Sequence, residues 1–133
     1  MHSKYPRANE LSSQLIGAAI EVHRIKGPGL LESIYRKCLL RELVLQGITA
    51  RQHVDVPIEY KGYVFEESLQ LDLFVEDSLI VELKAVTELQ PIHKGQLLSY
   101  MRLMDVPLGL LINFHEMRLI DGLHRLILPG AAD

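Results

Sequence analysis

The chain has 133 residues, 48% apolar and 23% charged, which predicts a single domain over 1–133, with an ordered core from about 9 to 128, and excludes a disordered chain. Fourteen Lys and Arg against 17 Asp and Glu leave a net charge of −3, which excludes a strongly basic nucleic-acid-binding coat but not a local basic patch. The single cysteine, Cys38, excludes an internal disulfide.

Two helices are predicted first. Apolar residues recur at helical spacing from about Leu11 to Ile25, with Asn9 as the N-cap. The run Gly27-Pro28-Gly29 ends this helix. A second helix is expected from Leu30 or Leu31 to Gln46, with Gly47 as its C-terminal stop.

Three strands follow, because the apolar period changes to two. They are expected over 54–60, 65–75 and from Leu79 onwards, with Lys61-Gly62 as the first turn. Side chains alternate across a strand, so the third strand places Leu79, Val81 and Leu83 on one face and Ile80, Glu82 and Lys84 on the other.

A third helix is expected over 93–104, with Pro91 in its first turn. The apolar segment 108–114 predicts a strand covered on both sides, and a short strand is expected over 123–128 before a frayed tail. The order helix, helix, three strands, helix, strand, strand predicts an α/β fold of the α+β type, with a mixed sheet and helices packed against it.

A membrane-spanning or secreted chain is not expected. The amino terminus is polar, and the longest apolar stretch, 106–114, is well short of the roughly 20 residues that a spanning helix needs. We therefore expect a cytoplasmic location.

The most informative polar group is Asp72 with Glu82 and Lys84. Glu82 and Lys84 project from one face of an apolar strand, where charge is expensive to desolvate unless it is paired or binds a ligand. Asp72 faces Glu82 if the connection has three residues, 76–78, whereas a two-residue loop places it on the opposite face. A functional site therefore predicts the three-residue connection or an equivalent bulge.

Two interpretations of this group are open. Two facing carboxylates repel unless a hard cation such as Mg²⁺ or Mn²⁺ lies between them, and a neighbouring lysine can orient water or neutralise charge on a phosphate. These groups together are those that metal-assisted hydrolysis of a phosphodiester requires. The alternative is an ordinary cross-strand ion pair of Lys84 with Glu82 or Asp72.

Three separated motifs carry a resemblance to a known family. They are G-x-x-E-x-x-Y over 29–35, LDLFVEDSLIVELKAV over 71–86, and QLLSY over 96–100. Together they resemble the GxxExxY family of bacterial proteins, which is assigned to the PD-(D/E)XK nuclease-like superfamily. The resemblance covers about 9–128 and implies a restriction-endonuclease-like αβββαβ core, here with an extra N-terminal helix.

The resemblance also implies roles for six residues. Asp72 and Glu82 match the acidic metal ligands, Lys84 the motif lysine, and Glu32 an acidic residue that contacts the metal directly or through water. Gln96 and Tyr100 match a Q-x-x-x-Y motif that borders the active site, and their spacing of four places them on one helical face. The chain departs from the pattern at Leu71, where a proline is common before the aspartate.

Simpler explanations stand beside some of these roles. A carboxylate at Glu32 is also favoured by the helix dipole, and Tyr35 lies on the apolar face as a packing residue. Gln96 and Tyr100 are either substrate contacts or a partly buried pair that supports Lys84.

Among the six histidines, His93 lies nearest to the proposed site. The basic residues Arg36, Lys37, Arg41, Arg51, Lys94 and Arg102 are candidates for nucleic-acid contact, although such charges commonly form a solvated face.

The first hypothesis is therefore a Mg²⁺- or Mn²⁺-dependent nuclease that acts on nucleic acid, DNA rather than RNA. The second is a catalytically silent module with the nuclease fold, which binds nucleic acid or a protein partner. The mean hydropathy of +0.13 is high for a small monomer and predicts a homodimer that hides apolar surface.

Overall fold

The computed structural model describes residues 1–133 and confirms the predicted order of helices and strands. The helices are α1 (Tyr5–Lys26), α2 (Glu32–Leu45) and α3 (Pro91–Met104), and a short 3₁₀ helix, η1 (Leu119–Gly122), was not predicted. The strands are β1 (Ala50–Tyr60), β2 (Tyr63–Val75), β3 (Leu79–Lys84), β4 (Leu108–Asn113) and β5 (Leu123–Ile127).

The five strands form one mixed sheet in the order β1-β2-β3-β4-β5. All neighbours are antiparallel except β3 and β4, which are parallel and joined through α3. A parallel pair requires such a crossover, and the faces of its strands are covered by helices. The six residues of β4 are accordingly all buried, as predicted.

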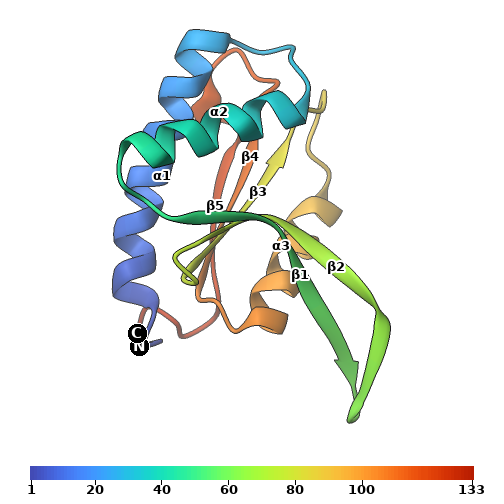
Figure 1. Cartoon of the computed structure of the whole chain (residues 1–133). Coiled ribbons are helices and arrows are strands. Elements are labelled where there is room, and N and C mark those ends of the chain that lie inside the picture. Colours follow the sequence, from blue (N-terminus) through green and yellow to red (C-terminus); the bar gives the residue numbers. More distant parts are fainter.

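Helices cover both faces of this sheet (Figure 1). Helices α1 and α2 pack with Leu73, Val81 and other apolar residues of one face, and α3 packs on the opposite face around Ile80 and Leu111. At Gly109 the approach of α3 is so close that a Cβ atom would lie 2.8 Å from Met101 Sδ. The sheet therefore has an apolar layer on each side, as expected for a largely buried sheet.

The terminal segments are more ordered than predicted. Helix α1 begins at Tyr5, so the predicted N-cap Asn9 lies inside it, where its Oδ1 accepts a hydrogen bond from Arg125 Nη2 at 2.5 Å. The predicted frayed tail returns to the amino terminus, where His2 N–H donates to Ala131 O at 2.9 Å. Figure 1 shows the two ends of the chain side by side. No helix in the structure combines the length and the apolar character that crossing a membrane requires.

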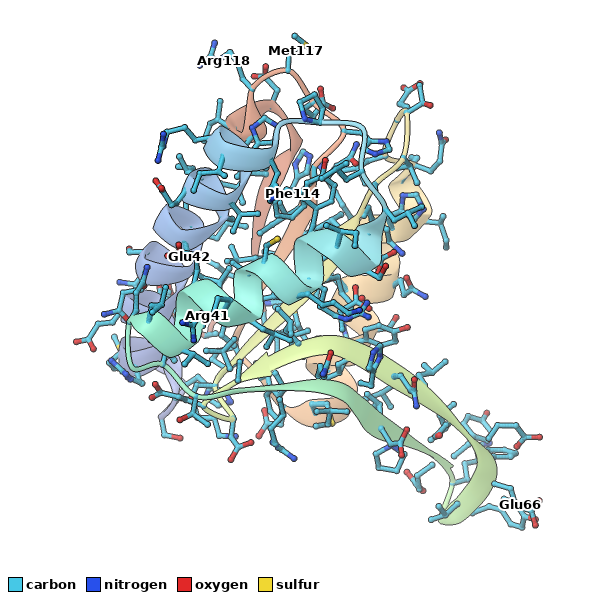
Figure 2. The ribbon with its side chains drawn as sticks, turned by 45° about the horizontal axis from the view of Figure 1, so that its top comes forward. Arg41, Glu42, Glu66, Phe114, Met117 and Arg118 are labelled. Atoms are coloured by element: carbon cyan, nitrogen blue, oxygen red, sulfur yellow. The ribbon has the colours of Figure 1, made fainter.

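The outer part of the β1–β2 hairpin projects from the body of the molecule (Figure 1). Its exposed large side chains include Tyr60, Tyr63, Val64 and Phe65. Figure 2 shows Glu66 near the outer end of this hairpin, away from the helices. The projecting part thus exposes apolar surface that nothing else in the chain covers.

The side chains of β2 pack into different apolar layers along the length of the strand. Leu73 packs into the layer with α1 and α2, whereas Leu71 packs into the layer with α3, and Asp72 lies between them. Opposite Asp72 on β1 lies His53, between the pairs Gln52↔Leu73 and Val54↔Leu71. The φ of His53 is 54°, a left-handed backbone that is costly outside glycine. The crossing between layers therefore coincides with a distorted position in the sheet.

Candidate active site

The candidate site lies where β2 and β3 diverge, next to Asp72 and Glu82. We call this point the fork. Leu73 pairs with Val81 and Val75 pairs with Leu79, so the connection has three residues, 76–78, as the site hypothesis required. The ladder between these strands stops at Leu73↔Val81. The next residues along the two strands, Asp72 and Glu82, stand opposite each other where the strands part.

The carboxylates of Asp72 and Glu82 replace backbone pairing at the fork. Asp72 N–H donates to Glu82 Oε1 at 3.1 Å, and Leu83 N–H donates to Asp72 Oδ2 at 2.8 Å. Hydrogen bonds of this kind give buried carboxylates a fixed orientation. Each carboxylate is therefore held by the strand that carries the other one.

The pKa of Glu82 is raised to about 9, first by burial and then by the charge of Asp72 and a hydrogen bond between the two side chains, whereas the backbone N–H of Asp72 and the charge of Lys84 oppose the rise. Because two carboxylates this close cannot both ionise easily, the pair holds a proton at neutral pH. A cation that binds between Asp72 and Glu82 would therefore displace the proton that this pair holds.

Lys84 follows two residues after Glu82, on the same face of β3, at the point where the strand pairs with Asn113 of β4. Its side chain is half-buried, and it takes part in none of the six ion pairs of the chain. The cross-strand ion pair with Glu82 or Asp72 that sequence reasoning left open is therefore not formed. Lys84 thus lies within electrostatic range of Glu82 without forming an ion pair.

Glu32 approaches the pair from the first turn of α2, where the helix dipole favours a carboxylate. Burial raises the pKa of Glu32, and the charge of Asp72 raises it further, whereas Lys84 and Arg36 oppose the rise. These couplings place Glu32 within electrostatic range of Asp72 and Lys84. The structure thus brings the G-x-x-E-x-x-Y motif to the fork.

The side chain of Tyr35 holds the loop that positions Glu32 near the fork. Its hydroxyl donates to Gly27 O at 2.6 Å and accepts from Leu30 N–H at 3.0 Å, so it bridges the loop before α2. Its ring is fully buried and stacks on Phe114 at 4.4 Å; Figure 2 shows Phe114 in the interior of the molecule. Tyr35 is a packing residue, as predicted, and it also fixes the loop that delivers Glu32.

The two residues of the Q-x-x-x-Y motif differ in their surroundings. Tyr100 is buried, and burial raises the pKa of its hydroxyl, with further contributions from the charges of Glu82 and Asp72. Gln96 is exposed one turn earlier on α3, and its side chain makes no hydrogen bond. The two side chains therefore do not form a bonded pair, and Tyr100 alone lies in the electrostatic field of the acids.

Two further residues border the fork: His53, which sequence reasoning did not connect with the site, and Arg36. His53, opposite Asp72, is one of the groups whose charge lowers the pKa of Glu32 against the larger effect of burial. Arg36 was a candidate for nucleic-acid contact, with a solvated face as the alternative; its side chain is 13% exposed, with Nη1 at 4.0 Å from Glu32 Oε1 and Nε donating to Gln52 at 3.2 Å. The place of Arg36 depends on the packing of α2 against β1, and that of His53 on the pairing of β1 with β2.

Two further polar side chains, His93 and Asn113, hold segments near the site. His93 accepts a hydrogen bond from Gln90 N–H at 3.0 Å and so caps α3, which gives its ring a structural role. Asn113 is fully buried within the apolar strand β4. It donates to Val86 O at 2.9 Å and accepts from Val86 N–H at 3.1 Å. It therefore fixes the segment that follows Lys84.

The donor set suits a hard divalent cation, but it is small. No three Asp, Glu, His or Cys side chains converge closely enough to form a metal-binding group by themselves. Asp72 and Glu82 supply two facing carboxylates, and oxygen ligands of this kind are those that Mg²⁺ and Mn²⁺ take, with water and substrate phosphate completing the shell. Glu32 lies outside the immediate contact of the pair.

The model of the PD-(D/E)XK nuclease superfamily matches residues 9–126 of the chain. This range includes all six residues of the predicted site, and the five-stranded mixed sheet with its helices agrees with a restriction-endonuclease-like fold. Searches of curated proteins and of solved structures found no match to the chain.

Proposed function

The chain belongs to the PD-(D/E)XK nuclease superfamily, and from that premise we propose that it is a Mg²⁺- or Mn²⁺-dependent nuclease that hydrolyses phosphodiester bonds of DNA. The superfamily consists typically of nucleases, which generally use divalent metal ions. Asp72 and Glu82 would hold the metal, and Glu32 would assist them directly or through water.

One observation supports this proposal above the others. Asp72 and Glu82 lie opposite each other where the hydrogen-bonded ladder between β2 and β3 ends. Lys84 lies near them and forms no ion pair. A purely structural acid pair would be expected to use the adjacent ammonium group as its counter-charge. Here that group is left free for another ligand.

The residues of the fork then have distinct tasks. A bound divalent cation supplies charge neutralisation at the phosphate. Lys84 orients the attacking water and donates a hydrogen bond towards the charge that develops on the phosphate oxygens. Tyr100 supports the carboxylates from the buried side of α3, and Gln96 contacts the nucleic acid from its exposed side.

Cleavage of single-stranded, duplex and branched DNA in the presence of Mn²⁺ tests this proposal. Lys84→Ala is expected to lower the cleavage rate roughly 100-fold or more, because it removes both a positioning contact and a positive charge. Lys26→Ala, which changes an exposed lysine at the end of α1, is the matched control and should cleave as the unmodified chain does. Equal rates for the chain and its Lys84→Ala variant on every substrate would refute the proposal.

A second candidate is a catalytically silent module that binds nucleic acid or a protein partner. The observation in its favour is that no third metal-binding side chain joins Asp72 and Glu82. This candidate predicts no heat of Mn²⁺ binding and retained partner binding after Asp72→Asn. A Mn²⁺ signal that disappears in Asp72→Asn would exclude it.

We also propose self-association through the projecting part of the β1–β2 hairpin. Its exposed Tyr60, Tyr63, Val64 and Phe65 form the kind of apolar surface that monomers rarely leave uncovered. Light scattering at micromolar concentration should give the mass of a dimer, and Tyr63→Ser with Phe65→Ser should lower it. A monomeric mass for the unmodified chain would contradict this expectation.

A further inference from the structure

A cavity of about 590 Å³ opens directly beside the fork. One wall is the loop 29–31 with Glu32 and Ile34 of α2, and the other is 85–86 with His115. The first wall thus contains Glu32, and the second begins one residue after Lys84. Its volume lies within the range of pockets that bind small ligands and nucleotides.

Buried side chains hold both walls in place. The first wall is bridged by the Tyr35 hydroxyl, and His115 Nε2 lies within hydrogen-bond distance of Leu30 O at 2.9 Å. The second wall is fixed by Asn113, which bonds both the N–H and the carbonyl of Val86. The cavity therefore exists before a ligand binds, and little ordering is needed when one enters.

The chemistry of the lining selects for an apolar or aromatic group rather than a phosphate. Five of its eight residues are apolar, Glu32 and His115 are the ionisable ones, and no lysine or arginine takes part. Leu31, at its rim, is 73% exposed although no packing within the chain requires a leucine there. A flat heterocycle gains from such a surface, whereas a phosphate would meet the carboxylate of Glu32.

We propose that this cavity receives an unpaired nucleobase of the strand whose phosphate lies at Asp72, Glu82 and Lys84. The inference rests on the proposed nuclease function and adds to it a substrate class: nucleic acid with an unpaired nucleotide next to the cleaved bond. Glu32, which lines the cavity, is electrostatically coupled to Asp72 and Lys84, and the second wall begins one residue after Lys84, so one strand spans both.

This geometry disfavours a fully paired duplex. A base reaches a pocket beside the backbone only after leaving the stack, and the free energy required is smallest for a base that is already unpaired. The chain should therefore discriminate between substrates that differ by one unpaired nucleotide, even where their charge is the same.

The test compares binding of two fluorescently labelled DNA duplexes, one fully paired and one with a single bulged nucleotide. Ca²⁺ replaces Mg²⁺ so that binding is measured without cleavage. The unmodified chain should bind the bulged duplex roughly tenfold more tightly. Ile34→Trp, which fills the cavity, should abolish the preference. Leu45→Trp, on the same helix but outside the cavity and 63% exposed, is the matched control and should retain it.

A second variant removes apolar rim surface without a risk to folding. Leu31→Ser should lower the preference for the bulged duplex without lowering the melting temperature, because Leu31 is exposed and is the N-cap of α2, a position that favours serine. Equal binding of both duplexes by the unmodified chain, or an unaltered preference in Ile34→Trp and Leu31→Ser, would overturn the base-binding inference. If Lys84-dependent cleavage persists in that case, the nuclease proposal stands; if no DNA is cut or bound, both fall.

Discussion

The carboxylate of Glu82 accepts a hydrogen bond from the backbone N–H of Asp72 at 3.1 Å, at the position where the ladder between β2 and β3 ends. The Asp72 carboxylate makes the corresponding bond to Leu83 N–H at 2.8 Å. This exchange satisfies the polar groups of the fork, and no buried side-chain nitrogen or oxygen of the chain lacks a partner. The raised pKa of Glu82 reflects the cost of burying this carboxylate first and the charge of Asp72 second.

The first prediction concerns the pH dependence of stability without metal. The pKa of Glu82 rises from 4.5 to about 9 on folding, so between these values the folded chain binds more protons than the unfolded chain. Stability is then greatest at the acidic end of this window and falls as pH rises, by at most about 1.4 kcal/mol per pH unit. Urea denaturation in EDTA should show this fall, and Glu82→Gln should flatten it. Glu66→Gln, on the exposed hairpin, should not; a similar slope in Glu82→Gln would contradict the prediction.

The second prediction is that Mn²⁺ binding releases a proton. Because the acid pair holds a proton at neutral pH, titration calorimetry in buffers of different ionisation enthalpy should report the release of about one proton per ion. Mn²⁺ affinity should rise with pH towards the pKa of Glu82 near 9. Asp72→Asn should abolish binding, and Asp55→Asn, an exposed aspartate on β1, should preserve it. Binding without proton release at any pH would show that the ion does not enter the fork.

The third prediction concerns the Tyr35 hydroxyl. Tyr35→Phe leaves the ring on Phe114 but removes the partner of Gly27 O and Leu30 N–H. The variant should lose about 1–3 kcal/mol of stability to urea, and Mn²⁺-dependent cleavage should fall because Glu32 is no longer held. Tyr60→Phe, in which the altered residue is 63% exposed, should change neither quantity. Full activity in Tyr35→Phe would show that the loop before α2 does not position Glu32.

The fourth prediction separates the two residues of the Q-x-x-x-Y motif. Gln96→Ala should leave stability within about 0.5 kcal/mol of the unmodified chain, because the side chain is exposed and makes no hydrogen bond. It should weaken DNA binding by roughly two- to tenfold if the amide contacts substrate. Gln14→Ala, an exposed glutamine of α1, controls for the loss of a surface amide. Unchanged binding in Gln96→Ala would leave Tyr100 as the only member of the motif that acts at the site.

Local pattern in the sequence identified Asp72, Glu82 and Lys84 as a group, and the structure supplied the register that makes the two acids face each other. Alternation placed Glu82 and Lys84 on one face of β3, and three residues between the strands are sufficient to bring Asp72 opposite Glu82, because the side-chain period of a strand is two. The same local reasoning placed the start of α2 at Leu30 or Leu31 and that of α3 at His93, each within two residues of the observed starts at Glu32 and Pro91. These features depend on residues close together in the chain.

Contacts between distant segments decided the rest. The burial of Arg36 against Gln52 depends on how α2 packs on the sheet, and the place of His53 opposite Asp72 depends on how β1 pairs with β2. The cavity beside the fork needs His115 to reach Leu30, 85 positions earlier in the chain. Hydrophobic periodicity reports which face of an element is buried, but not which partner covers it, since burial is not directional. For this reason the sequence alone could identify the acids of the site, whereas their surroundings required the tertiary structure.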